Sequence, residues 1–293
     1  MGNTCRYKCL TSWYGNGWKR CSLYVFIYSE DCVMTRARDF ANVISGNFDL
    51  PAGALDNAAT TPPTITAATS SGTWNRPTGC KKIRITLVGG GGGGGGAKTT
   101  DTSAIAVAGG GGGGGACITS FIDVTSISTF DYTVGSAGSG GSGVSPSGGG
   151  GGGSTTCTIN SIEYTGGGGG AGNSAGGTST QALGKGGDGG SGYAFQSSFL
   201  DASYAVGIKG EVGGSYDSIV YSSTGEFSAT NGGNSIFGGG PRGGTRTDAG
   251  TIGPTTTIYG YGSGGCGGFR WDGNTHSSGG SGRGGVIVIE EYY

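Results

Sequence analysis

The sequence predicts a mostly non-helical fold: about ten glycine-rich rods packed side by side as a sandwich, capped at one end by a small antiparallel β-sheet. Glycine accounts for 73 of the 293 residues, about 25%, against a usual value of about 7%. Because glycine costs roughly 1 kcal/mol at each helical position, this composition argues against helices. A net charge of −1 and 10% aromatic residues argue against an unstructured chain, which usually combines high net charge with few aromatics.

The chain divides into three parts by composition. Residues 1–33 are a cysteine-rich extension, and one hypothesis is that Met34 is the native start. Residues 34–71 hold a short polar-to-apolar stretch and a linker rich in Pro, Thr and Ala. Residues 72–293 form the glycine-rich domain. Its cysteines are widely scattered and are expected to be small buried thiols. They are Cys80, Cys117, Cys157 and Cys266.

Three segments have the hydrophobic pattern of β-structure. Lys82–Val88 alternates apolar and polar residues, the period of a half-buried strand. Val286–Glu290 is a second apolar strand near the end of the chain, and residues 116–134 read as a hairpin. The residues expected to face inward are Ile83, Ile85 and Leu87 in the first strand, and Ile118, Ile122 and Val124 in the hairpin.

Between these segments the glycines cluster in runs that could form rods. A glycine rod in the left-handed three-residue helix points its N–H and C=O groups outward, about 3.1 Å apart along the axis per residue. Rods lying side by side can therefore bond to one another through the backbone, and only glycine permits such close approach. The runs are residues 89–96, 109–115, 135–143, 148–153, 166–172, 184–192, 207–214, 232–240, 260–268 and 279–285.

An even number of rods has a topological consequence. If each rod reverses the direction of the last, the chain returns to the end at which it began. The two apolar strands and the hairpin then meet at one end, where a small sheet can form. The odd-numbered connectors lie at the opposite end, the tip. These connectors are residues 97–108, 144–147, 173–183, 215–231 and 269–278.

The order of motifs resembles the glycine-rich domain of tailed-phage tail fibres and receptor-binding adhesins. The resemblance covers about residues 72–293. It rests on Trp74-x-x-Pro77, the KKIRITLV strand, the polyglycine run that follows, YTVG at Tyr132–Gly135, and the terminal GRGGVIVIE at Gly282–Glu290. It implies a sandwich of polyglycine II helices whose tip loops bind a host-cell receptor. It also implies a virion location, extracellular when acting. The stretch MTRARDFANVISG, within residues 34–71, is similar to the N-terminal segment that joins some phage fibre proteins to other virion proteins.

The tip connectors supply the candidate receptor-binding residues. Exposed aromatics beside acids and amides give large contact area with few rotatable bonds, and they suit stacking on sugar rings. The expected partner is a host outer-surface protein or polysaccharide, and the sequence leaves monomer and homotrimer open. The candidate residues are Tyr216, Asp217, Tyr221, Phe227, Phe269, Trp271, Asp272, Asn274 and His276.

Other functions find little support in the sequence. Catalysis is not expected, because His276 is the only histidine and has no nucleophile-elbow context. Neither a metal nor a cofactor is expected, since the cysteine spacing fits no common zinc site. The near-zero net charge argues against nucleic-acid binding, and no apolar run is long enough to insert into a membrane. Two alternatives stay open: an ice-binding or other surface-active polyglycine protein, and a disordered glycine-rich RNA-binding or wall protein.

Overall fold

The fold is known from a computed structural model, which is β-rich and contains no helix in the part that it describes. No helix long and apolar enough to cross a membrane occurs among these residues. The described residues are 62–99, 106–177, 181–183, 185, 187, 190, 192–195, 205–214, 227–228, 230–243, 245–247, 250–251, 260–270 and 276–293.

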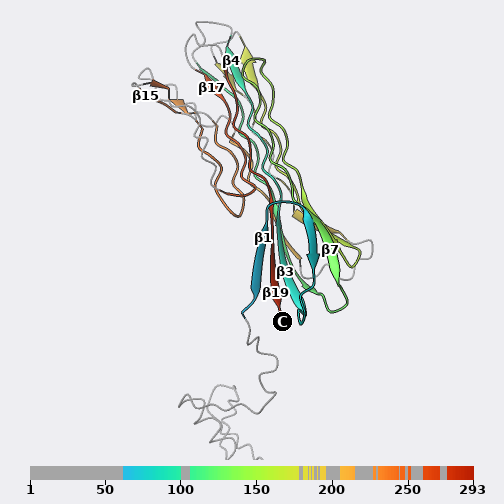
Figure 1. Ribbon diagram of the computed structural model, residues 1–293. Helices are drawn as coiled ribbons and strands as arrows, with labels where there is room; N and C mark the ends of the chain where they lie inside the picture. Colours follow the sequence, from blue (N-terminus) through green and yellow to red (C-terminus); the bar gives the residue numbers. More distant parts are fainter. Residues whose placement is uncertain are drawn as a thin grey trace, which may run out of the picture. The chain divides into compact units, whose positions relative to one another are not determined.

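Two five-stranded antiparallel sheets face each other at one end of the glycine-rich domain (Figure 1). Sheet A has the strand order β1-β19-β3-β6-β13, with bounds Thr64–Ala68, Val286–Tyr292, Lys82–Val88, Cys117–Asp123 and Ala205–Ile208. Sheet B has the order β12-β9-β8-β7-β2, with bounds Gly192–Phe195, Ile162–Gly166, Thr155–Ile159, Thr129–Thr133 and Gly72–Asn75.

An apolar core fills the space between the two sheets. The expectation that Ile118, Ile122 and Val124 face inward is confirmed, since they are 1%, 8% and 0% exposed. The alternating residues of β3 are also fully buried, as their spacing predicted. Trp74 and Phe130 of sheet B join the same core, with ring centroids 5.0 Å apart. The cap is therefore a β-sandwich with its own core, larger than the single small sheet that was expected.

The hairpin of β8 and β9 is the main part of the cap that the sequence analysis did not identify. Ile159 and Ile162 face each other across a two-residue turn at Asn160 and Ser161, whose φ angles are 51° and 63°. Positive φ at both central residues matches the twist of the flanking strands. Cys157 and Tyr164 project from this hairpin into the core. The alternating pattern of residues 155–164 was the available signal.

The domain begins earlier than residue 72. Residues 34–71 were expected to be an attachment segment and linker, yet Thr64–Ala68 is strand β1 and pairs with β19 along its whole length. The compact unit accordingly starts at Thr61. The proposed extension, residues 1–33, lies outside the described residues.

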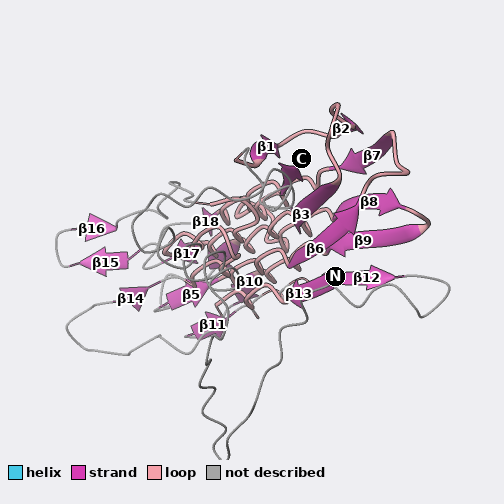
Figure 2. Ribbon diagram, turned by 90° about the horizontal axis from the view of Figure 1, so that it is seen from below, coloured by secondary structure: helices cyan, strands magenta, loops and turns pink. Residues whose placement is uncertain are grey.

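The glycine runs extend from the sandwich as rods 1 to 10, numbered in chain order (Figures 1 and 2). Rods 1 to 5 are residues 89–96, 109–115, 135–143, 148–153 and 166–172. Rod 6 is described at residues 185, 187 and 190. Rods 7 to 10 are residues 209–214, 231–234, 262–268 and 279–285.

Rod 1 is bonded to six neighbouring rods. Its eight N–H groups donate in turn to residues in or next to rods 2, 4 and 10, so that every third residue of rod 1 bonds to the same rod. The N···O distances are 2.8 to 3.0 Å. Its carbonyls accept from rods 3, 5 and 9; for example, Gly138 and Gly141 of rod 3 donate to Gly91 and Gly94. Rods 2, 4 and 10 run antiparallel to rod 1, and rods 3, 5 and 9 run parallel to it.

Lateral hydrogen bonds arrange the ten rods in three layers. The order of neighbours is 4-5-6 in one outer layer, 3-1-2-7 in the middle and 10-9-8 in the other outer layer. Rods 1 and 2 occupy the centre, and rod 2 also has six neighbours: rods 1, 5, 6, 7, 8 and 9. The bundle thereby satisfies buried backbone groups that would otherwise cost free energy.

Close approach explains why the central rods are pure glycine. A Cβ on Gly93 would lie 1.9 Å from the carbonyl oxygen of Ser139, and one on Gly94 would lie 2.0 Å from that of Cys266. No side chain fits at such distances. Rods at the edge of the bundle need glycine only at the positions that face a neighbouring rod. Rod 3 carries exposed serines at every third residue: Ser136, Ser139 and Ser142.

The expectation that residues 232–240 form one rod is wrong. The chain turns at Ser235 and Gly238, which bridge each other, and it then runs back beside rod 8. Gly240 donates to Asn234 Oδ1 across 2.7 Å, and Gly232 donates to the carbonyl of Pro241 across 3.1 Å. Glycine serves turns as readily as rods, so composition alone did not mark this reversal.

The four cysteines of the described chain are free and buried, as their scattered positions predicted. Burial raises the pKa of the Cys157 thiol to about 12. Such thiols are packing groups and have little thiolate character at neutral pH.

Candidate receptor-contact tip

The tip is built on the far ends of the two central rods. Rod 1 runs into β4 (Ala97–Thr99), and rod 2 follows β5 (Ala106–Ala108). Each of these strands is the centre of a three-stranded sheet. The sheets are β10-β4-β18 and β11-β5-β17, in which the outer strands are Ala175–Gly177, His276–Ser277, Gln181–Leu183 and Phe269–Arg270.

Small apolar side chains hold the tip sheets on the bundle. Ala97 and Val107, from the two ends of connector 97–108, form a buried cluster with Ala175 of connector 173–183. The amine of Lys98 donates to the carbonyl of Val144 across 2.9 Å and so ties the turn between rods 3 and 4 to β4. The tip strands therefore stand on a support that lateral hydrogen bonds fix from below.

A further sheet lies beside the tip, with the order β14-β15-β16 and bounds Phe227–Ser228, Thr245–Thr247 and Gly250–Thr251. Two contacts join the adjoining chain to the bundle. Thr230 donates its hydroxyl to the carbonyl of Gly109, and Gly243 donates to Asn231 Oδ1 across 2.9 Å. The residues after rod 8 thus return toward the tip end.

Three of the nine candidate residues lie in described strands. His276 is exposed on β18, directly opposite Lys98 in the register. Phe227 lies on β14 opposite Arg246. Phe269 is only 3% exposed, so its ring is buried under the tip and is not offered to a partner. The other six candidates lie outside the described residues: Tyr216, Asp217, Tyr221, Trp271, Asp272 and Asn274.

Two further residues at the tip were not singled out from the sequence, although their connectors were assigned to this end. Lys98, which is half-buried, comes two residues after the first polyglycine run, and Val144, 58% exposed, lies in the shortest connector. Their position after a rod was the available signal. In the described part of the chain no group of three His, Cys, Asp or Glu side chains lies close enough to hold a metal ion. The described part of the tip therefore presents both polar and apolar side chains, on strands that the bundle supports.

A family model described as a glycine-rich domain matches residues 66–292, which includes both the sandwich and the rods. No curated protein matches the sequence.

Proposed function

We propose that this chain, which belongs to the glycine-rich domain family, is a non-enzymatic receptor-binding protein of a phage tail fibre. The observation that carries the proposal is the meeting of three separate connectors at one end of the bundle. β4, β10 and β18 come from residues far apart in sequence, yet they form one sheet at the end opposite the β-sandwich. A rigid scaffold that gathers connectors at its tip is a common basis for recognition.

The proposal includes the conformation of the rods as polyglycine II helices packed in a sandwich. The three-residue repeat in the hydrogen bonds of rods 1 and 2 supports it, because that helix has three residues per turn. Six neighbours per central rod also match outward-pointing N–H and C=O groups. Such a bundle is stiff, so it holds the tip strands β4, β5, β10 and β18 in place before a partner binds.

The proposed partners follow from the two ends. The tip connectors contact a host outer-surface protein or polysaccharide, while residues 34–60, which precede the compact unit, join the chain to other fibre proteins of the virion. Aromatic residues of the tip, among them Tyr221 and Trp271, supply the contact area. Many copies per particle would add avidity to weak individual contacts.

An ice-binding function is the second candidate, and one observation favours it. Ser136, Ser139 and Ser142 form an exposed row on rod 3 at every third residue, which places hydroxyls at a regular spacing of about 9 Å. Thermal hysteresis of the purified chain measures this function directly. Hysteresis that the serine-to-alanine variants abolish would favour ice binding over receptor binding.

Adsorption to bacterial envelopes tests the receptor proposal. The full chain is incubated with envelope fractions from a panel of bacteria, untreated, protease-treated or periodate-treated. We expect binding to one fraction, and a loss of about tenfold or more in Trp271→Ala or Tyr221→Ala. Thr158→Ala, at an exposed position of the sandwich, is the control and should bind normally. Equal binding by all variants would contradict the tip assignment.

A further inference from the structure

The outer face of sheet A is unusually apolar for a sheet surface. Neighbouring strands place Ile65, Phe121, Val206 and Ile208 on this face, with exposed fractions of 63%, 51%, 63% and 46%. Val288 lies between them and is partly exposed. Antiparallel sheets that face water normally present polar residues on that side. The pattern therefore indicates a face that is covered in the working protein.

The outer face of sheet B provides an internal comparison. It belongs to the same sandwich, and its outward residues on β2, β7, β8 and β9 are polar. They are Thr73, Asn75, Thr129, Asp131, Thr133, Thr156, Thr158, Glu163 and Thr165. On β12, at the edge of the sheet, the register places Tyr193 and Phe195 opposite Thr165 and Glu163. Four of the five strands of sheet B thus lack the outward apolar residues that several strands of sheet A carry.

A turn of the bundle extends the apolar surface at one end of sheet A. Ile236 and Phe237 lie in the turn after rod 8, and Tyr261 precedes rod 9; they are 50%, 43% and 46% exposed. Ser235 of this turn donates its hydroxyl to the carbonyl of Tyr261. A Cβ on Gly262 would lie 2.7 Å from Val88 Cγ1 of β3, which places the turn against the outer side of sheet A.

We call this combined surface the apolar shelf. It contains seven of the nine large hydrophobic side chains that are exposed among the described residues. They are Ile65, Phe121, Val206, Ile208, Ile236, Phe237 and Tyr261. Four strand spacings of about 4.8 Å and a strand length near 20 Å give the whole outer face of sheet A an area of roughly 400 Å², which the apolar side chains share with four charged residues. Apolar patches of this size on a single chain are often interaction sites.

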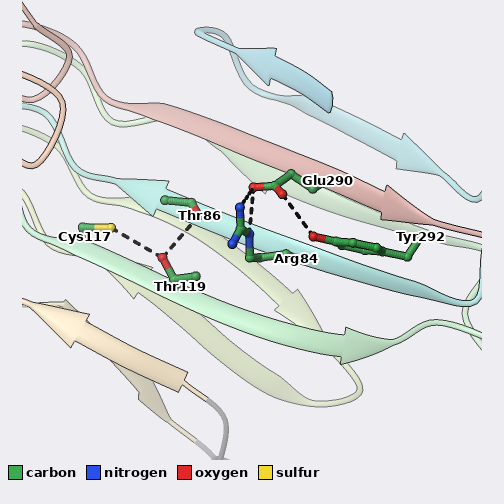
Figure 3. Close-up of polar contacts among 6 residues, drawn as sticks. All are labelled: Arg84, Thr86, Cys117, Thr119, Glu290 and Tyr292. Atoms are coloured by element: carbon green, nitrogen blue, oxygen red, sulfur yellow. Dashed lines mark hydrogen bonds and ion pairs between the residues drawn. The ribbon is translucent and has the colours of Figure 1, made fainter. Parts of the chain in front are cut away.

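The charges on the shelf are already balanced (Figure 3). Arg84 donates from Nε to Glu290 Oε1 across 2.7 Å and from a second nitrogen to the same oxygen. Tyr292 donates its hydroxyl to the other oxygen of Glu290 across 3.2 Å, and its ring lies beside that of Phe121. The Arg84 guanidinium also lies 5.7 Å from the Phe121 ring centre. A charge whose partner is present can be covered at far lower cost than an isolated one.

We propose that the apolar shelf is the interface with a second copy of this chain. Its outward charges are two basic and two acidic: Lys82 and Arg84 against Asp123 and Glu290. Because these charges sum to zero, two copies of the shelf do not repel each other when they pack face to face about a twofold axis. A strongly charged partner would find no opposite net charge on this surface. The interface lies at the sandwich end and is independent of receptor binding at the tip.

Sedimentation velocity of the full chain, from low micromolar to about 200 µM, tests the proposal. Because the sheet part is small compared with standard interfaces, we expect a dimer with a dissociation constant on the order of 10 µM. Phe121→Asp and Val206→Asp, on two different strands, should each weaken it at least tenfold. Val144→Asp is the matched control, since it puts the same charge at a valine of similar exposure at the tip.

Thermal unfolding of each variant distinguishes lost association from lost folding. Ile65→Asp on β1 is a third variant should either of the others fail to fold. A dimer that Phe121→Asp or Ile65→Asp disrupts, and that Val144→Asp leaves intact, supports the proposal. A chain that stays monomeric over the whole range, or a dimer that Val144→Asp weakens as much as Phe121→Asp does, overturns it. A monomer would leave the shelf to another protein or surface.

Discussion

Trp74 donates its indole N–H to Oε1 of Glu291 across 2.8 Å, and both side chains are only 6% exposed. This hydrogen bond joins β2 of sheet B to β19 of sheet A through the middle of the sandwich. Tyr293 donates to the second oxygen of Glu291 across 3.0 Å. The last strand of the chain is thereby fastened to one of the first.

Replacing Trp74 by Phe should destabilise the domain by about 2 to 3 kcal/mol. The variant keeps most of the packing against Phe130 but leaves one oxygen of a buried carboxylate without its donor. Thermal or urea unfolding measures the change. Thr73→Ala is the control, because the neighbouring Thr73 makes an exposed hydrogen bond to Asp131, and its loss should cost less than about 0.5 kcal/mol. Equal effects of the two substitutions would contradict the role of the Trp74 bond.

Alternate residues of β19 should differ sharply in their sensitivity to truncation. Ile287 is fully buried in the core, so Ile287→Ala should lower the free energy of unfolding by about 2 to 4 kcal/mol. Val288 points to the outer face of sheet A, and Val288→Ala should cost less than about 1 kcal/mol. Urea titration of both variants checks the order, and a reversed order would show that the strand has a different register.

The stability of the domain should fall as the pH rises above 9. The folded Cys157 thiol has a pKa of about 12, raised by burial from an ordinary value of 9.0. Between these values the unfolded chain loses its proton while the folded chain keeps it, so the free energy of unfolding decreases with pH. The full effect of three units is about 4 kcal/mol.

Urea unfolding at pH 8 and pH 10.5 measures this dependence. Cys157→Ala should show a shallower decline than the unchanged chain, in addition to a constant loss from the missing sulfur. Thr156→Ala, at the residue of β8 that precedes Cys157, should keep the original slope. An identical slope in Cys157→Ala would mean that other groups govern the alkaline behaviour.

Strand positions with strict alternation could be predicted from the sequence, and positions that depend on glycine could be predicted only in part. The alternation of Ile83, Ile85 and Leu87 identifies β3, because apolar side chains on one face of a strand pack into the core. The chain reversal at Ser235–Gly238 could not be predicted from the sequence, because glycine is equally suited to a rod and to a turn. The segment of rod 7 has few glycines, yet Gly210 and Gly213 alone face rod 2 and are sufficient there.

The site was predictable at the level of connectors but not of side chains. Counting rod reversals assigns Lys98, Val144 and His276 to one end, because each follows or precedes a rod in a known direction. The burial of Phe269 could not be anticipated, since it depends on the pairing of β17 with β5 across a long sequence separation. An aromatic residue in a connector is equally suited to contact with a receptor and to packing inside the protein.

Glycine-to-alanine substitutions should cost far more stability in the central rods than in the outer rods. Gly93→Ala puts a methyl group 1.9 Å from the Ser139 carbonyl oxygen in the central rod, and we expect a loss of more than about 3 kcal/mol or failure to fold. Gly151→Ala is the matched control in outer rod 4, where the nearest atom is 3.8 Å away, and it should be nearly neutral. Thermal unfolding compares the two, and equal stability would exclude close packing of rod 1.

Amide hydrogen exchange in residues 89–96 and 109–115 tests most directly whether laterally bonded bare backbone supports the tip. Mass spectrometry of peptides from the full chain reports these segments separately. Since every N–H of rods 1 and 2 is bonded to a neighbouring rod, we predict protection by a factor of about 1,000 or more throughout both segments. Exchange at the rate of an unstructured chain would contradict the bundle and the tip that it carries.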